Sequence, residues 1–267
     1  MSIALSTRDA RTMFRRNLRH IRRYPSLTVM LLAQPVLIML LFVFVFGETL
    51  GAGVSPDLVG GGRAAYLAYV VPGILLFAIA GVGLGTAISV AADRTKGIMS
   101  RLRTMGIGRS AVLAGEVLGS MAQAGFVLLV VAAIAVLLGY RPGGGPDGLI
   151  AAIGLAAAIS VAVIWICLAL GLNSRSVETA SNTPLLLILL MFLSSAFVPA
   201  DSYPAGLRWF AEHQPFTPMV EGMRGLLEGA PDAATVVTAL AWCVALSLLG
   251  YFWARHLYER EPAAVVG

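Results

Sequence analysis

The chain has 267 residues, of which 58% are apolar and 12% are charged, with a formal net charge of +5. Soluble globular domains carry about 25% charged residues. This composition therefore excludes an ordinary soluble protein and is typical of a helical protein that crosses a membrane several times. The 19 basic residues cluster beside apolar runs, which argues against nucleic acid as a partner. The two cysteines lie inside apolar runs and the three histidines are scattered, so neither a disulfide nor a metal site is predicted.

The first 25 residues are predicted to form an amphipathic helix on the cytoplasmic surface. Seven arginines precede the first apolar run, and a helix here separates most of them from Leu18 and Ile21. Such a helix lies flat on anionic headgroups. The segment is not predicted to be a cleavable signal, because the apolar run after it lacks a small-residue cleavage site.

Six apolar runs predict an all-α polytopic membrane protein with one transmembrane domain, residues 26–254. The predicted spans are 26–46, 66–91, 111–138, 149–172, 183–199 and 233–254, and a tail follows at 255–267. Pro35 predicts a kink in the first span. Gly81, Gly83 and Gly85 predict close helix packing by the second. The fifth run is shorter than the roughly 20 residues that a bilayer span needs.

The distribution of basic residues predicts that both termini are cytoplasmic. In this orientation fifteen of the nineteen lysines and arginines lie on the cytoplasmic side, as the positive-inside rule requires. The four outer ones are Arg63, Arg141, Arg208 and Arg224.

Between the fifth and sixth spans, the sequence predicts two short helices that fold back against the outer membrane surface. Pro204 and Pro218 are placed as first-turn prolines, Thr217 as an N-cap, and Gly229 and Pro231 as the end of the second helix. This second helix has one apolar and one charged face. The apolar face holds Met219, Met223, Leu226 and Leu227, and the charged face holds Glu221, Arg224 and Glu228. We expect Arg224 to pair with the two glutamates.

This last third of the chain resembles the ABC-2 family of transporter permeases, the group typified by daunorubicin-resistance membrane subunits. Prolines at fixed spacing and a closing Arg-Gly-Leu-Leu carry the resemblance, which extends over nearly the whole chain. The matching residues are Phe197, Val198, Pro199, Pro204, Leu207, Phe210, Pro215, Thr217, Pro218, Arg224, Gly225, Leu226 and Leu227. The resemblance implies the membrane-spanning subunit of an ATP-binding-cassette exporter in a bacterial cytoplasmic membrane. It also implies two separate ATPase chains and a second permease copy or a paralogue, because six spans are half of the usual transporter.

The resemblance assigns a role to the cytoplasmic loop 92–112, where permeases of this family dock onto the ATPase. The matching residues are Asp93, Arg94, Gly97, Arg101, Leu102 and Arg103. Many relatives have a proline where this chain has Gly106, so the end of the docking helix stays undefined. The residues by themselves favour a loop whose arginines only bind lipid headgroups.

Three polar side chains inside the apolar runs, Gln34, Glu116 and Gln123, are candidates for the substrate path. Hydrogen bonds between helices, or snorkelling of Glu116 to the inner surface, are the alternative roles. At the outer end a gate is expected to close the path. Its candidate residues are Met219, Met223, Arg224, Leu226 and Leu227.

The sequence contains no GxxxxGK[ST] loop, GxSxG elbow or HExxH motif. We therefore expect no catalytic, cofactor-binding or metal-binding residues in this chain, and ATP to bind only in the partner subunit. A proton-coupled secondary exporter and a lipid-modifying membrane enzyme are the alternatives. The first requires ionisable groups near mid-membrane, and the second a convergent set of polar groups. The substrate class stays open between amphipathic drugs, lipids and glycans.

Overall fold

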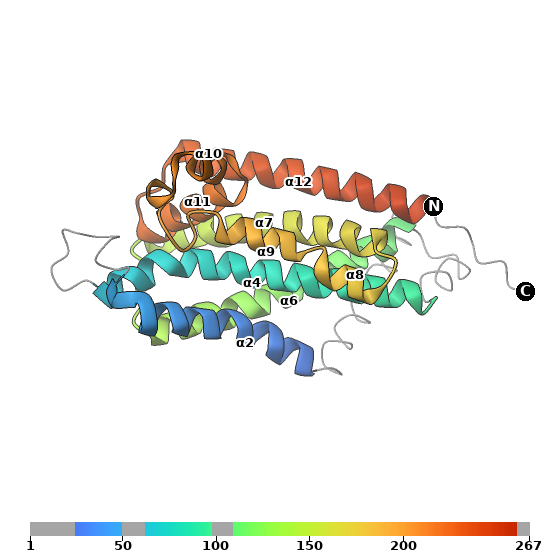
Figure 1. Ribbon diagram of the computed structural model, residues 1–267, viewed down its shortest axis with the longest axis horizontal. Coiled ribbons are helices and arrows are strands. Elements are labelled where there is room, and N and C mark those ends of the chain that lie inside the picture. The colour runs from blue at the N-terminus through green and yellow to red at the C-terminus, as the bar shows by residue number, and fades with distance from the viewer. Residues whose placement is uncertain (1–24, 50–61, 98–108, 261–267) are drawn as a thin grey trace, which may run out of the picture.

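The computed structural model describes residues 25–49, 62–97 and 109–260, and within these ranges all regular secondary structure is helical (Figure 1). The predicted N-terminal helix lies outside the described residues, except for Pro25. So do Arg101, Leu102 and Arg103 of the predicted docking loop and residues 261–267 of the tail.

Five helices of the described part are long and apolar enough to cross a membrane. They are α2 Pro25–Leu41 with its π-helical continuation η1 Phe42–Phe46, α4 Gly62–Thr95, α6 Arg109–Leu137, α7 Gly145–Asn173 and α12 Ala233–Arg260. This confirms a polytopic helical membrane protein. The α2 helix runs through Pro35, and the change in its hydrogen-bond pattern comes later, at η1.

The fifth predicted span is a broken segment rather than one helix. The predicted span 183–199 contains α9 Leu185–Phe192 and the turns that follow it up to Pro199. The helix α8 Val177–Asn182 precedes this range, and the 3-10 helix η2 Ala200–Ser202 follows it. Ser176 caps α8 by accepting a hydrogen bond from the Thr179 amide. Pro184 separates the two helices because it has no amide hydrogen to continue the ladder.

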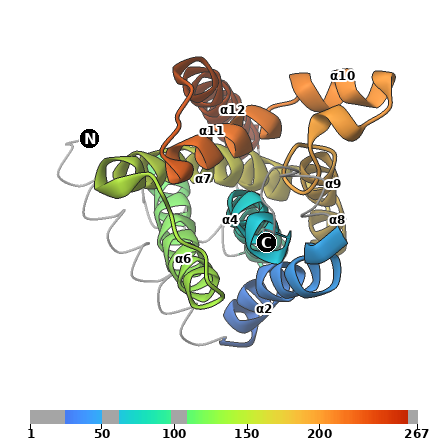
Figure 2. The same ribbon diagram turned by 90° about the vertical axis from the view of Figure 1, so that its left-hand side faces the viewer.

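Helix α4 lies at the centre of the bundle, with α2, α6, α7, α8 and α9 around it (Figure 2). Twenty of its residues are buried. A Cβ atom at Gly83 would lie 2.8 Å from the sulfur of Cys167 in α7, and Gly81 and Gly85 face Leu31 of α2. The prediction that these glycines serve close helix packing is confirmed most directly at Gly83.

Two short helices, α10 Ala205–His213 and α11 Phe216–Glu228, precede α12 as predicted. Gly229 ends α11 with a φ of +82°, which confirms its predicted place. The predicted N-cap is wrong. Helix α11 begins one residue before Thr217, and the buried Thr217 hydroxyl donates instead to the Ala211 carbonyl of α10.

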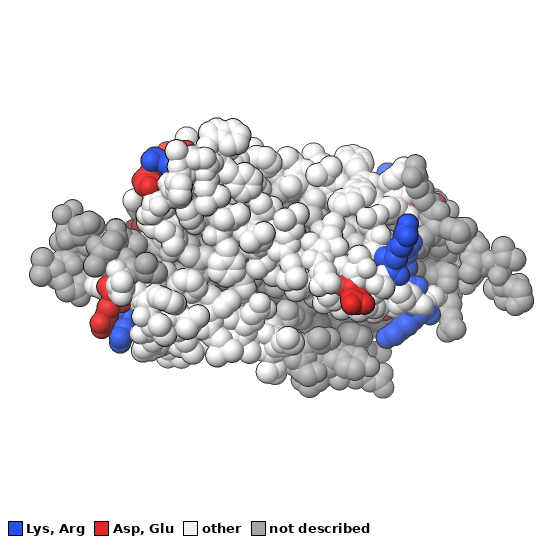
Figure 3. Space-filling view, in the orientation of Figure 1, with Lys and Arg blue, Asp and Glu red and all other residues white. Residues whose placement is uncertain are grey.

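Charged side chains gather toward the two ends of the molecule, and a broad band without charge lies between them on the face shown in Figure 3. The long helices run along this axis (Figure 1). An uncharged band of this kind is what contact with the hydrocarbon core of a bilayer requires.

Candidate functional site

Side chains from α4 and α11 converge on the turns that follow α9. We call this group the Arg224 cluster; it consists of Tyr66 and Tyr69 of α4, Ser195 and Phe197 of the turns, and Arg224 of α11. The Arg224 Nη2 atom donates to the Ser195 carbonyl at 3.0 Å and to the Tyr69 carbonyl at 3.2 Å. Its guanidinium carbon lies 3.8 Å from the centre of the Tyr69 ring. Arg224 therefore joins three segments that are distant in the sequence.

The two tyrosines complete the hydrogen bonding of the same turns. Tyr69 donates its hydroxyl to the Ser195 carbonyl at 2.8 Å, and Tyr66 donates to the Phe197 carbonyl at 3.0 Å. Residues 194–197 are buried. Buried backbone outside a helix is costly unless side chains supply its missing partners. The cluster thus stabilises a break in the fifth apolar run.

Close packing brings these groups within reach of one another. A Cβ atom at Gly73, one turn after Tyr69, would lie 2.7 Å from the Ala196 carbonyl oxygen. The Phe197 ring stacks on Phe42 of η1 at 4.9 Å and on Phe192 of α9 at 4.7 Å between ring centres. The turns after α9 are therefore enclosed by η1, α4 and α11.

The predicted pairing of Arg224 with Glu221 and Glu228 is wrong. Within the described residues the guanidinium donates to backbone carbonyl groups, and neither glutamate forms an ion pair with it. Helical spacing alone places the three residues on one side of α11, but the nearby carbonyl groups offer Arg224 a better-enclosed set of acceptors. Burial raises the pKa of Glu228, and the positive charge of Arg224 partly opposes that rise.

The apolar face of α11 is buried as predicted. Met219, Met223, Leu226 and Leu227 are each at most 7% exposed. The helix packs on α4, α7 and α12. At its end, the Leu227 carbonyl accepts a hydrogen bond from the Gly144 amide at 3.0 Å, in the loop between α6 and α7.

At the opposite end of the bundle, Arg94 extends from the last turn of α4 to the end of α7. It donates to the carbonyl groups of Leu172 and Ser174, the latter at 3.0 Å. These are carbonyls of the C-terminal turn, where a positive charge is favourable. Of the predicted docking residues, Asp93, Arg94 and Gly97 are described; Gly97 ends the helix with a φ of +67°. Arg94 thus contributes to the base of the loop rather than to a free surface.

The family model of the ABC-2 type transporters matches residues 8–227. This chain belongs to the ABC-2 type transporter family. It is similar to the daunorubicin resistance ABC transporter permease protein DrrB1 of Streptomyces coeruleorubidus, with 26% identity over 91% of this chain and 83% of that protein. It is also similar to a probable doxorubicin resistance ABC transporter permease protein, DrrC, of Mycobacterium tuberculosis, with 25% identity over 67% of this chain and 65% of the relative.

The three polar residues predicted for a path of this ABC-2 permease lie on α2 and α6. Gln34 is exposed on α2, whereas Glu116 and Gln123 are half-buried on α6. A path lined by these three residues stays a prediction.

Sequence reasoning missed Tyr66, Tyr69 and Ser195 as members of the site. The two tyrosines three residues apart at the start of the second span were a usable signal, because buried tyrosine hydroxyls need an acceptor. It also missed a buried hydrogen bond of 2.8 Å between Thr86 of α4 and Ser120 of α6. No group of three or more potential metal ligands occurs within the described part of this ABC-2 permease.

Proposed function

We propose that this ABC-2 permease forms the membrane path of an exporter together with a second copy or a paralogue. Two separate ATPase chains power it, and the substrate is an amphipathic drug-like molecule. The observation that carries this proposal is a broken apolar segment that the Arg224 cluster holds beside a central helix. Non-helical backbone at membrane depth is tolerated where protein encloses it or where it lines a path. The relatives named for daunorubicin and doxorubicin resistance favour a drug-like substrate over a lipid or glycan.

The proposed topology has six crossings with both termini in the cytoplasm. Residues 1–25 are an interfacial helix, 26–254 the transmembrane domain and 255–267 the tail. The α8–α9 segment and the turns after it make the fifth crossing. The end that carries Arg94 and Arg175 faces the cytoplasm in this topology, because this orientation assigns fifteen of the nineteen lysines and arginines to cytoplasmic segments.

Affinity purification of the tagged permease from its native membrane tests the energy source. We expect an ABC ATPase to co-purify with the permease. We also expect drug export from right-side-out vesicles to require ATP inside the vesicles. Export that continues without ATP and stops when an ionophore collapses the proton gradient would instead establish the secondary exporter. ATPase activity of the complex that glycan or lipid precursors stimulate, and that drugs do not, would overturn the proposed drug-like substrate. It would leave the proposal of an ATP-driven exporter intact.

The docking loop is tested by replacing Arg101 and Arg103 with alanine. We expect a protein that still inserts but in which ATPase activity is uncoupled from export, since these arginines lie in the proposed docking loop. Arg175→Ala, on the next cytoplasmic link, is the matched control. If the double variant exports at the native rate, its arginines bind only lipid headgroups.

We propose that Met219, Met223, Arg224, Leu226 and Leu227 close the outer end of the path in the resting state. The burial of the four apolar side chains supports this role. The substitution Leu226→Asp places a charge in that packing and is expected to leak small solutes or to stall export. Gly206→Asp adds the same charge at the same end in open space and serves as the control. Native export without leak from a well-expressed Leu226→Asp protein would refute the gate.

A further inference from the structure

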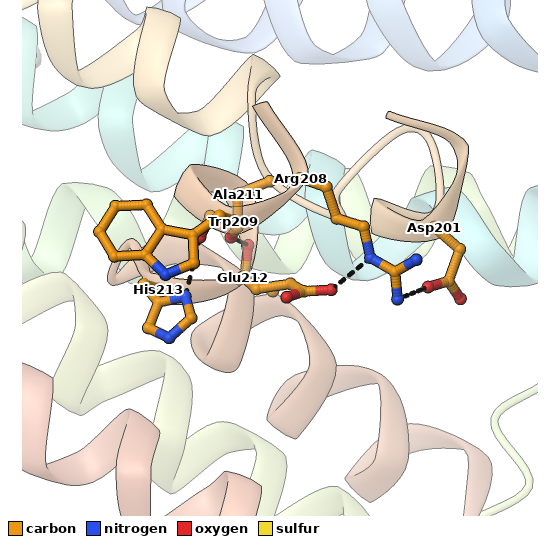
Figure 4. Close-up of polar contacts among 7 residues, drawn as sticks. Asp201, Arg208, Trp209, Ala211, Glu212 and His213 are labelled. Atoms are coloured by element: carbon orange, nitrogen blue, oxygen red, sulfur yellow. Dashed lines mark hydrogen bonds and ion pairs between the residues drawn. The ribbon is translucent and has the colours of Figure 1, made fainter. Parts of the chain in front are cut away.

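A glutamate four residues after an arginine on the same helix forms an ion pair with it at two places in this structure. In α10 the Arg208 Nε atom lies 2.7 Å from the Glu212 carboxylate, and Asp201 supplies a second carboxylate to the same guanidinium (Figure 4). In α12 the Arg255 Nε atom lies 3.0 Å from the Glu259 carboxylate. The spacing is therefore well suited to ion pairs on the helices of this protein.

Arg224 of α11 has carboxylates at such positions and uses neither. Glu228 follows it by four residues and Glu221 precedes it by three, and both glutamates are exposed. Within the described part of the chain the guanidinium donates instead to the carbonyl groups of Tyr69 and Ser195. These acceptors belong to α4 and to the turns after α9, so they are available only while α11 is docked there. The glutamates belong to α11 itself and move with Arg224.

A buried tyrosine near the same charges lacks an acceptor. Tyr140, in the loop between α6 and α7, is 7% exposed, and its hydroxyl forms no hydrogen bond within the described residues. Burial raises the pKa of Tyr140 to about 12; the negative charge of Glu228 adds to this rise, and the positive charge of Arg224 opposes it. The hydroxyl thus lies within electrostatic reach of both side chains. A buried donor without an acceptor is unfavourable, so this hydroxyl gains from a rearrangement that brings a carboxylate to it.

We propose that Glu221 and Glu228 are positioning residues that bind Arg224 when α11 separates from the turns after α9. The inference rests on the proposed exporter, in which the outer end of the path must open. Opening removes the carbonyl acceptors from a half-buried guanidinium, and a charge left there without partners is strongly unfavourable. The glutamates supply the replacement partners. They stabilise the open arrangement more than the closed one and so bias an equilibrium between two positions of Arg224.

The double substitution Glu221→Gln with Glu228→Gln tests this role in the complete permease–ATPase complex. Daunorubicin, for which one relative is named, is the probe in right-side-out vesicles that contain ATP. We expect export to fall by about two- to fivefold, the effect on an equilibrium of losing two exposed helical ion pairs. The free energy of unfolding should not change, because the glutamines remove no hydrogen bond of the closed form. Glu212→Gln is the matched control on α10 and should leave export unchanged.

A cysteine probe at Ser195 measures directly whether the turns separate from α11. Cys167 and Cys243 are first replaced with alanine, so that the probe is the single thiol. Ser195 is 2% exposed, and its hydroxyl has no hydrogen-bond partner among the described residues, so Ser195→Cys removes no bond. We expect a thiol reagent to label this variant slowly at rest and faster during ATP turnover. The acceleration should be smaller when both glutamates are replaced with glutamine.

Three results overturn the proposal. Export by the double glutamine variant at the native rate shows that the glutamates do not assist opening. A loss of export with an equal loss of stability shows that they only support the closed fold. Labelling of Ser195→Cys that ATP turnover does not accelerate shows that the turns stay docked on α11. A native complex that does not export daunorubicin contradicts the proposed substrate, whereas accelerated labelling during ATP turnover supports the exchange of partners on its own.

Discussion

Arg224 has a role that its neighbours on the helix do not predict. Its planar guanidinium donates to the carbonyl groups of Tyr69 and Ser195 and lies over the Tyr69 ring. A lysine ammonium is a compact point charge, so it reproduces neither the two-directional donation nor the stacking. The Arg-Gly-Leu-Leu end of α11 is thus an anchor for the broken fifth segment.

We expect Arg224→Ala to reduce the free energy of unfolding by about 1.5–3 kcal/mol, the range for hydrogen bonds that involve a charged group. Arg224→Lys should fall between the alanine variant and the native protein. Unfolding in mixed micelles measures the effect. Arg208→Ala is the control, because its ion pairs are exposed and contribute little. Equal stability of the two alanine variants would contradict the role of the cluster.

Asp232 provides a pH-dependent contribution at the start of α12. Its carboxylate accepts hydrogen bonds from the Thr235 amide at 2.9 Å and the Ala234 amide at 3.3 Å. The hydrogen bond that the Thr235 hydroxyl donates, followed by these two amide bonds, lowers the pKa of Asp232 below its ordinary value. Because the folded state favours the ionised form, this stabilisation is present above the ordinary pKa and is lost as the pH falls through the lowered one.

Asp232→Ala should therefore unfold at a lower temperature than the native protein at neutral pH, and the difference should narrow in acid. Thermal unfolding across this range measures it. Asp232→Asn keeps a cap without the charge and should show a smaller difference with less pH dependence. If the difference in unfolding temperature between the native protein and Asp232→Ala is the same at all pH values, the ionised cap is not the cause of that difference.

At the scale of elements, the docking of α11 depends on the loop between α6 and α7. The Gly144 amide donates to the Leu227 carbonyl, and Gly143 and Gly148 also lie against the last turn of α11. Gly144 has an ordinary φ of −72°, which other residues also adopt. Glycine is required at this position because a side chain would not fit. A Cβ atom there would overlap the Leu226 carbonyl oxygen.

Gly144→Ala is expected to displace the end of α11 and to cost about 1–3 kcal/mol, as overpacking usually does. Gly154→Ala is the matched control, since nothing lies within 4 Å of its added methyl group. It should be neutral or stabilising in the middle of α7. The free energy of unfolding is measured for both variants. An unchanged value for Gly144→Ala would show that the loop between α6 and α7 shifts to accommodate the methyl group without displacing α11.

On the scale of the whole molecule, the structure determines which segments share an end of the bundle. Asp147 begins α7 beside the last turn of α11, and Thr217 ties α11 to α10. Arg175 follows the far end of α7, which is long enough to cross a bilayer. Relative sidedness thus comes from the fold, whereas absolute orientation comes from the charge distribution.

Reporters fused at Asp147 and His213 should therefore show one side of the membrane and a reporter at Arg175 the other. The positive-inside rule makes the first pair external and predicts a cytoplasmic signal at Arg175 and Arg101. Accessibility to an impermeant thiol reagent, with cysteine at the same positions, checks the fusions. Opposite sides for Asp147 and His213 would contradict the fold, while reversal of all sites would change only the orientation.

The sequence by itself determined the class of the protein, the long spans, the two short helices and the buried face of α11. Each of these depends on local composition or on helical periodicity, which a bilayer solvent makes easy to recognise. It also carried the family resemblance through its proline spacing. Gly229 was predictable because the left-handed end of a helix requires a residue without a side chain.

Only the tertiary structure decided where Arg224 donates and how the fifth segment breaks. The acceptors of Arg224 lie 29 and 155 residues away along the chain. Local spacing offered Glu221 and Glu228 instead, and nothing local reveals a carbonyl that an irregular turn leaves unpaired. A buried polar group takes the partner that the assembled fold brings to it, because an unsatisfied backbone acceptor costs more than an exposed ion pair returns.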